Sequence, residues 1–244
     1  MKRLISGLAA AAVAGMALLP AGTLASSSGN RCFHVYAPYR SYSTAGGCRS
    51  GYVRVALRAG TQQVLTVTNW RRTRTYALFN GFTLTAGRWA HRWGPWTARI
   101  GARGFAAPGK KIEGDALTPQ GSYRFQFMFG VNANPGTHFS WRHAYRYDYW
   151  DDDPASARYN LWTDARYHYP GKNPEPMHNV PAYNYAAVIG YNLARVPGAG
   201  SAIFLHVGDG RATAGCVSLP QADLLKIIRW LRPSRVPVIT MGVL

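Results

Sequence analysis

Acidic residues, cysteines and long apolar segments are all scarce in this chain. Only 10 of the 244 residues are Asp or Glu, whereas 28 are Lys or Arg, so the formal net charge is +18 at pH 7. After residue 25 no segment approaches about 20 consecutive apolar residues, which excludes a transmembrane helix there. Even so, 47% of the residues are hydrophobic, enough for one sizeable core.

The one long apolar segment lies at the N-terminus. Two basic residues precede the apolar stretch 4–19, and Thr23 and Ala25 place small residues before a cleavage site. This pattern predicts a secretory signal peptide at 1–25. A membrane anchor is the alternative, but the stretch is short for a span and rich in alanine. We therefore expect an exported protein, secreted or held at the cell wall.

If the protein is exported, its positive charge can bind only anionic partners outside the cell. Loss of Lys2 and Arg3 with the signal peptide would still leave a net charge of +16. Outside the cell the candidate partners are anionic cell-wall polymers, lipid head groups and carboxylates of cell-wall peptides. Nucleic acid fits less well, because the arginines are scattered and no nucleic-acid-binding motif is recognisable. A basic surface without a partner is the alternative.

An exported chain with three cysteines is expected to keep one free thiol. Cys32 and Cys48 lie 16 residues apart near the expected mature N-terminus and can pair in an oxidising compartment. Two unpaired thiols are the alternative. The bridge would staple an N-terminal extension at 26–60, and we expect regular structure to begin near Gly51. Cys216 is then the odd cysteine.

The rest of the chain, 61–244, predicts a mostly β domain. The candidate strands are 53–57, 63–68, 76–79, 82–84, 96–100, 121–129, 186–191, 202–207 and 236–241. Asn80-Gly81 between two of them predicts a hairpin turn. The one clear helix follows Leu219-Pro220, where apolar residues recur at helical spacing. The long aromatic middle, 130–185, has no clear periodicity, and such segments often carry binding loops.

His206 and Cys216 stand ten residues apart in two apolar stretches. A thiol becomes a useful nucleophile when a nearby base favours its thiolate, so we predict Cys216 as nucleophile and His206 as its general base and acid. Gly215 would let the backbone approach a substrate and offer an amide to an oxyanion. A buried structural cysteine and a structural histidine are the alternative. The residues expected to contact substrate are Gly208, Thr213 and Ala214.

This segment resembles the L,D-transpeptidase catalytic domain family, the YkuD-type enzymes that cross-link peptidoglycan. The resemblance is carried by His206-Val207-Gly208 and then Thr213-Ala214-Gly215-Cys216-Val217. It extends from about Gln63 to Leu244 and looks closest to an actinobacterial-style subgroup. The further matching landmarks are Lys111-Ile112-Glu113-Gly114-Asp115, Thr118-Pro119-Gln120-Gly121, Trp150-Asp151-Asp152-Asp153-Pro154, Tyr159-Asn160 and the stretch from Gly200 to His206.

The resemblance implies a YkuD-like β-sandwich or barrel with one C-terminal helix and long irregular aromatic loops. It implies that Cys216 attacks the carbonyl between the L-centre of a diamino acid and a terminal D-alanine in a peptidoglycan stem peptide. His206, oriented by a backbone carbonyl, would move the protons. The side-chain amine of a second stem then forms a 3-3 cross-link, whereas water would make the enzyme an L,D-carboxypeptidase. No cofactor or metal is implied, carbapenems should acylate Cys216, and we expect a monomer.

Two departures leave other functions open. The histidine that usually stands two residues before the cysteine is Ala214 here, and the segment between His206 and Cys216 is shorter than in the best-known members. One alternative is a non-catalytic cell-wall-binding protein that keeps the fold. Another is a sortase-like transpeptidase, although the sortase Thr-Leu-x-Thr-Cys motif is missing. Papain-like wall peptidases place cysteine before histidine, the reverse of this chain.

Three further motifs have structural explanations. The run Asp151–Asp153 lacks the glycine-bearing loop of a calcium site and predicts a solvated turn, with substrate positioning as the alternative. The Glu113/Asp115 pair predicts a structural turn at the rim of a groove. The tryptophans at 89, 93 and 96 predict core packing, with a glycan platform as the alternative. Zinc is not expected, because no HExxH motif occurs.

Overall fold

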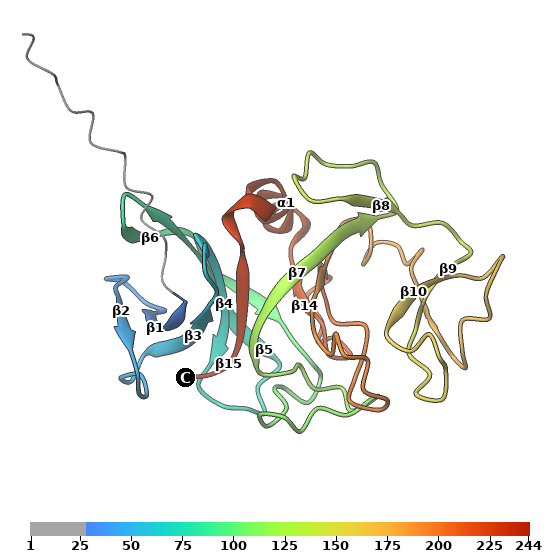
Figure 1. The fold of residues 1–244 in the computed structure, drawn as a ribbon, viewed down its shortest axis with the longest axis horizontal. Helices are drawn as coiled ribbons and strands as arrows, with labels where there is room; N and C mark the ends of the chain where they lie inside the picture. Colours follow the sequence, from blue (N-terminus) through green and yellow to red (C-terminus); the bar gives the residue numbers. More distant parts are fainter. Residues whose placement is uncertain (1–27) are drawn as a thin grey trace, which may run out of the picture.

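The computed structural model describes residues 28–244, so the predicted signal peptide lies outside the described residues. Eight strands close into a barrel, in the order β12-β13-β14-β6-β5-β4-β15-β7, with β7 pairing back onto β12 (Figure 1). A barrel of this size is filled by its own side chains. The mostly β prediction is confirmed. The barrel strands are β4 (Gln63–Asn69), β5 (Tyr76–Thr85), β6 (Arg88–Arg99), β7 (Gly121–Gly130), β12 (Ala186–Ile189), β13 (Phe204–Val207), β14 (Val217–Leu219) and β15 (Val238–Val243).

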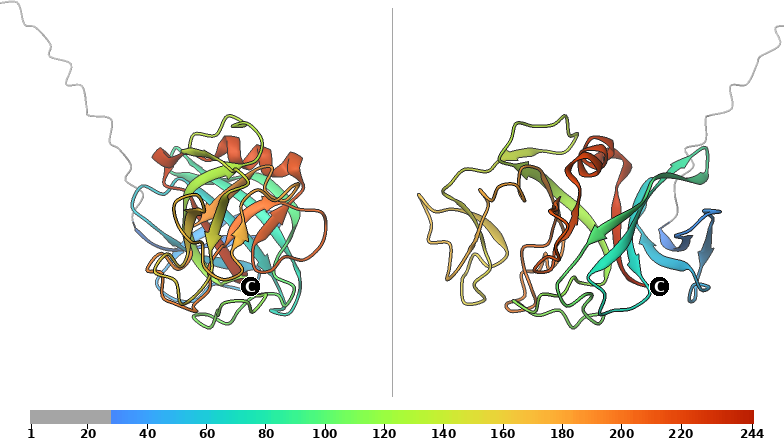
Figure 2. Two further views of the ribbon diagram at one scale, coloured as in Figure 1. Left: turned by 90° about the vertical axis from the view of Figure 1, so that its right-hand side faces the viewer. Right: turned by 180° about the vertical axis from the view of Figure 1, so that it is seen from behind.

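Two small sheets flank the barrel at opposite ends of the molecule (Figures 1 and 2). The N-terminal sheet holds β1 (Gly29–His34), β2 (Ser41–Thr44) and β3 (Tyr52–Leu57). The other sheet, from the aromatic middle of the chain, holds β9 (Asp148–Asp151), β10 (Leu161–Asp164) and β11 (Glu175–Pro176), while β8 (Trp141–His143) pairs with β7. The predicted helix is α1 (Gln221–Trp230), followed by the 3-10 turn η1 (Pro233–Arg235). No helix within 28–244 is long and apolar enough to cross a membrane.

Three apolar clusters join these layers. The barrel interior contains Leu65, Val67, Leu205, Val217, Ile239 and the buried face of α1. The cluster between the barrel and the β9–β11 sheet contains Phe129, Trp150, Trp162, Phe204 and Cys216. The cluster under the N-terminal sheet contains Phe33, Val55, Val64 and Val238. Because side chains alternate along a strand, neighbours such as Phe204 and Leu205 belong to different clusters. Trp93 and Trp96 pack against the first cluster and Trp89 against the third, so core packing is confirmed.

Two predictions of local structure are wrong. Regular structure begins at Gly29 rather than near Gly51, because β1 pairs along its whole length with β3 and buries Cys32 and Phe33. Asn80-Gly81 is not a turn but lies inside β5, at an irregularity in the pairing with β6. The Asn80 side chain is fully buried there and donates to the Val35 carbonyl at 3.1 Å. Tertiary hydrogen bonds therefore override the local turn preference.

The predicted disulfide between Cys32 and Cys48 is confirmed. It ties the fully buried Cys32 of β1 to the loop before β3, at a sequence separation of 16. Cys216 is the free cysteine of the described residues and is buried. The chain therefore carries one thiol that can react and one bridge that restrains the N-terminal sheet.

Replacing both bridge cysteines, Cys32→Ala with Cys48→Ala, should lower the melting temperature. Closing a loop of this length contributes on the order of 3 kcal/mol to the free energy of unfolding. For a chain of this size, its loss should lower the melting temperature by roughly 6–12 °C. Differential scanning calorimetry measures the shift. An unchanged melting temperature would show that the bridge does not restrain the unfolded chain.

Candidate active site

The two residues of the predicted dyad share one face of the barrel wall. β13 and β14 run parallel, with Leu205 opposite Val217 and His206 opposite Ser218. Leu205 and Val217 point into the barrel interior, so Phe204, His206 and Cys216 point outward, toward the β9–β11 sheet. His206 and Cys216 are therefore diagonal neighbours on this face.

A cleft of about 610 Å³ lies over this face. All six residues predicted to form the site line it: His206, Gly208, Thr213, Ala214, Gly215 and Cys216. The opposite wall comes from the aromatic middle of the chain, which contributes Asp152, Glu175 and residues 179–183. The expectation that this middle segment forms loops at a binding site agrees with the cleft, and of these residues the sequence had named only Asp152, within the run 151–153.

The Cys216 thiol is held protonated. Cys216 is only 8% exposed. Its thiol donates to the Ala202 carbonyl at 3.2 Å, and its sulfur accepts from the Phe204 amide at 3.3 Å. Burial raises the pKa of the thiol to about 12, although the Phe204 amide opposes that rise. The thiolate is therefore scarce at neutral pH, and a base has to act when a substrate is attacked.

His206 is set up as a neutral base. Its Nδ1 lies 2.8 Å from the Val207 carbonyl, which can only accept, so Nδ1 carries the proton and Nε2 is unprotonated. Burial lowers the pKa of His206, which favours the neutral ring. Asp209 pairs instead with Arg211 at the exposed end of the cleft. A backbone carbonyl thus orients this histidine.

Just before Cys216, Gly215 adopts a backbone conformation that favours glycine. Gly215 adopts φ +149°, and an added Cβ would lie 3.0 Å from the Leu117 carbonyl oxygen. Its amide donates to the Thr213 hydroxyl at 3.1 Å, and that hydroxyl donates to the Cys216 carbonyl at 2.7 Å. Thr213 therefore holds this turn together. Ala214 is exposed at the rim of the cleft.

Gly208 begins the segment that leads from β13 to β14. A Cβ at this position would meet the Ser218 hydroxyl at 2.6 Å. Close packing against β14 therefore requires glycine here, in addition to its place in the cleft lining.

Carboxylates gather in the cleft of this basic protein. Glu113, Asp152 and Glu175 all line it. Burial raises the pKa of Asp152 to about 7, and the nearby Glu113 adds to that rise. Burial also raises the pKa of Glu175, whose carboxylate accepts from the Tyr183 hydroxyl at 3.1 Å. The cleft therefore holds these three carboxyl groups, while its two cationic side chains, Lys111 and Arg211, pair with Asp115 and Asp209.

The predicted solvated turn at 151–153 is wrong for its first residue. Asp151 is fully buried and accepts from the Ser156 hydroxyl at 2.6 Å, so it is structural. Asp152 lines the cleft instead. Glu113 agrees with the expected groove rim, whereas Asp115 forms a buried ion pair with Lys111 at 2.6 Å. Among residues 28–244 no group of three His, Cys, Asp or Glu residues is arranged to hold a metal ion.

Replacing Asp152 should make stability depend less on pH. The folded state holds this proton up to about pH 7, against an ordinary pKa of 3.8, so stability falls as pH rises between those values. At pH 8 the charged carboxylate costs roughly 1 kcal/mol of folding stability after solvent screening, so Asp152→Asn should raise the melting temperature by about 2–4 °C. At pH 4 the substitution should change the melting temperature little. Thermal melts at both pH values measure this.

Asp164→Asn is the matched control. Its hydrogen bond with Arg166 lowers the pKa of Asp164, so this substitution should not raise the melting temperature at pH 8. An equal rise for Asp152→Asn at pH 4 and pH 8 would rule out ionisation as the cause.

Comparison with known proteins identifies the family of this chain. No curated protein and no solved structure matches the chain significantly. A model of the L,D-transpeptidase catalytic domain, YkuD, matches residues 52–239, which include the cleft residues from Lys111 to Ser218. Because that match spans most of the sequence, the chain belongs to the L,D-transpeptidase catalytic domain family, whose members act on peptidoglycan.

Proposed function

We propose that this protein is an exported cysteine acyltransferase that joins peptidoglycan stem peptides by 3-3 cross-links. The observation that carries the proposal is the placement of Cys216 and His206 on one face of paired strands, inside the cleft, with Nε2 of His206 free to accept a proton. The family match supports an L,D-transpeptidase reaction.

In the first half-reaction the sulfur of Cys216 attacks the carbonyl that joins the diamino acid to the terminal D-alanine. Nε2 of His206 takes the thiol proton, and the carbonyl oxygen gains the negative charge. The amide of Cys216 is the proposed donor to that oxyanion. The Gly215 amide, also expected from the sequence, donates to the Thr213 hydroxyl in the substrate-free protein and would have to leave it to join. The amine of D-alanine then leaves with the proton from Nε2, and a thioester on Cys216 remains.

In the second half-reaction the side-chain amine of another stem attacks the thioester. His206 takes a proton from that amine, Cys216 departs as thiolate, and the proton returns to the sulfur. The acidic cleft supports this choice of acceptor, because Asp152 and Glu175 favour an approaching ammonium group. If water attacks instead, the product is a shortened stem, and the protein acts as an L,D-carboxypeptidase.

Ala214 is compatible with this chemistry. The position is exposed at the rim of the cleft, while the hydrogen bonds of Cys216 go to Ala202 and Phe204. A histidine at 214 is therefore not needed to hold the thiol. The proposal thus assigns substrate contact, rather than activation, to Gly208, Thr213 and Ala214.

Export and wall binding complete the proposal. We propose that residues 1–25 are removed as a signal peptide and that 26–60 form the stapled extension of a catalytic domain at 61–244. The disulfide is consistent with an oxidising compartment. We propose that the protein acts as a monomer at the wall, where its positive charge meets anionic polymers.

Incubation with purified tetrapeptide stems tests the enzyme directly. The wild-type protein should give cross-linked dimers, with tripeptides as the hydrolysis product, by mass spectrometry. Cys216→Ala should give neither, and His206→Gln should be slower by about 10²–10⁴-fold, because it lacks the base. Asp209→Asn, which alters a carboxylate outside the dyad, is the control and should stay active.

A carbapenem provides a second, substrate-independent test of the nucleophile. The wild-type protein should gain one adduct at Cys216, and Cys216→Ala none. A folded wild-type protein that forms no adduct and converts no stem would refute the enzyme, leaving the non-catalytic wall-binding protein as the better account.

Binding to purified cell walls should be electrostatic. Raising the salt concentration from about 0.05 to about 0.5 M should release the protein, because surface charges are then screened. Co-sedimentation measures this, and walls stripped of anionic polymers should bind less. Binding that is insensitive to salt would show that specific contacts, rather than the net charge, hold the protein.

A further inference from the structure

The carbonyl that accepts the Cys216 proton belongs to a strained residue. Ala202 adopts φ +50°, a left-handed conformation that is uncommon for residues with a side chain. Gly200, two residues earlier, adopts φ +94°. Such a backbone persists only when its surroundings hold it in place, and strain of this kind often occurs at functional sites.

Asn160 holds the strained residue directly. The Ala202 amide donates to the Asn160 Oδ1 atom at 3.3 Å, and the Trp150 indole donates to the same oxygen at 2.9 Å. The Asn160 amide group donates in turn to the carbonyls of Tyr191 and Asn192, at 3.2 and 2.9 Å. This buried side chain thus fixes the plane of the peptide that precedes Ala202.

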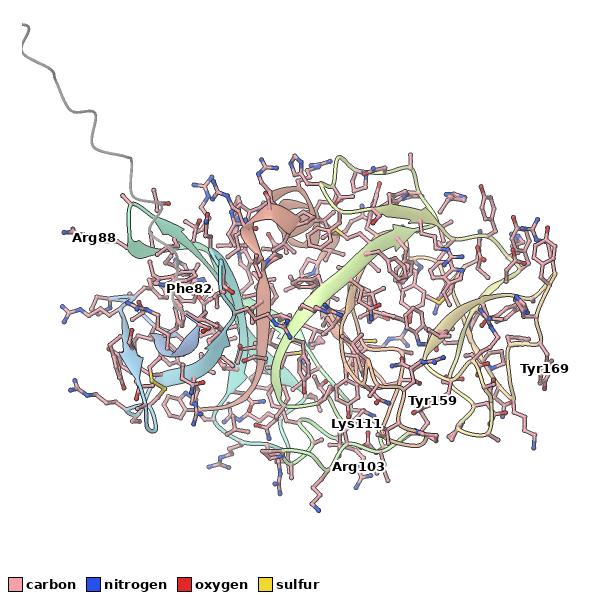
Figure 3. All side chains as sticks on the ribbon, viewed as in Figure 1. Phe82, Arg88, Arg103, Lys111, Tyr159 and Tyr169 are labelled. Atoms are coloured by element: carbon pink, nitrogen blue, oxygen red, sulfur yellow. A yellow bond between two sulfur atoms is a disulfide. The ribbon has the colours of Figure 1, made fainter. Side chains whose placement is uncertain are left out.

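Tyr159 and Glu113 hold the preceding two residues. The Gly200 amide donates to the Tyr159 hydroxyl oxygen at 3.0 Å, and that hydroxyl donates to the Glu113 carboxylate. The Ser201 hydroxyl donates to the same carboxylate oxygen at 2.8 Å. Tyr159 lies beside the loop that carries Lys111 in the lower part of Figure 3. Segments far apart in the sequence therefore converge on residues 200–202.

We propose that Glu113, Tyr159 and Asn160 are positioning residues for Cys216, because they hold residues 200–202 so that the Ala202 carbonyl retains the thiol proton in the substrate-free protein. The proton then reaches His206 only when a bound substrate moves the thiol or that carbonyl. This inference deepens the proposed function and rests on it for the role of Cys216 as nucleophile. It gives a role to landmark residues that lie outside the dyad.

Alkylation of Cys216 by iodoacetamide, followed from pH 6 to pH 10 by mass spectrometry, tests the proposal without a substrate. In the wild-type protein the rate should still be rising at pH 10. Tyr159→Phe removes one hydroxyl and keeps the ring, and Asn160→Ala removes the contact to Ala202. Each should lower the apparent pKa of the thiol and speed alkylation at pH 8 about tenfold for each unit of that shift.

Two controls separate positioning from general loosening. Tyr42→Phe removes a tyrosine hydroxyl that accepts from the Arg49 amide in the N-terminal sheet, at the other end of the molecule from the β9–β11 sheet, and should leave the profile within about twofold of wild type. The variant with Cys32→Ala and Cys48→Ala should melt earlier and keep the wild-type profile. The titratable groups around the thiol, unchanged in every variant, are Lys111, Asp152, Glu175, Tyr183 and His206.

The result that overturns the proposal is a folded Tyr159→Phe protein whose alkylation profile matches wild type. An identical change in the variant without the disulfide would overturn it as well, because the effect would then reflect stability alone. If Asn160→Ala does not fold, Tyr159→Phe decides the question. Since alkylation requires no acyl transfer, a failure of the proposed function would appear separately, as a lack of product from tetrapeptide stems.

Discussion

Parallel pairing of β13 with β14 is the constraint on which the site depends. The register places His206 opposite Ser218 and leaves Cys216 on the same outward face. A slip of one residue would turn Cys216 into the barrel interior, since side chains alternate along a strand. The segment 208–216 closes this pairing through Gly208, packed on Ser218, and Gly215, packed on Leu117.

The two faces of β13 have different roles, one in the barrel core and one on the side of the cleft. Leu205 and Val207 belong to the barrel core, while Phe204 is buried in the cluster against the β9–β11 sheet and His206 lines the cleft. The far wall of the cleft is built from the aromatic middle of the chain and carries carboxylates, although the protein as a whole is strongly basic. This contrast is what the proposed function requires, namely a basic surface that meets an anionic wall and a cleft that admits an amine.

Sequence reasoning found the parts of the structure that local chemistry determines. The helix after Pro220 and the disulfide follow from spacing and cysteine count. The roles of His206 and Cys216, expected from chain order, are part of the proposed function. Asn80-Gly81 was read wrongly, because buried hydrogen bonds of Asn80 outweigh a turn preference. Glu175 and the left-handed backbone of Ala202 were missed, because loops without periodicity bring them to the cleft. Asp152 was named only within the run 151–153, with substrate positioning as the alternative. Only the fold shows that Glu113, Tyr159 and Asn160 meet at one strained segment.

The central claim is that Cys216 carries the acyl group. Rapid quenching of the wild-type protein with a tetrapeptide stem, followed by mass spectrometry of the intact protein and its peptides, tests this most directly. We predict a transient thioester, with a mass increase equal to the tripeptide acyl group, on the peptide that contains Cys216. Products that form in the wild-type protein without any such adduct, or that persist in Cys216→Ala, would contradict the account.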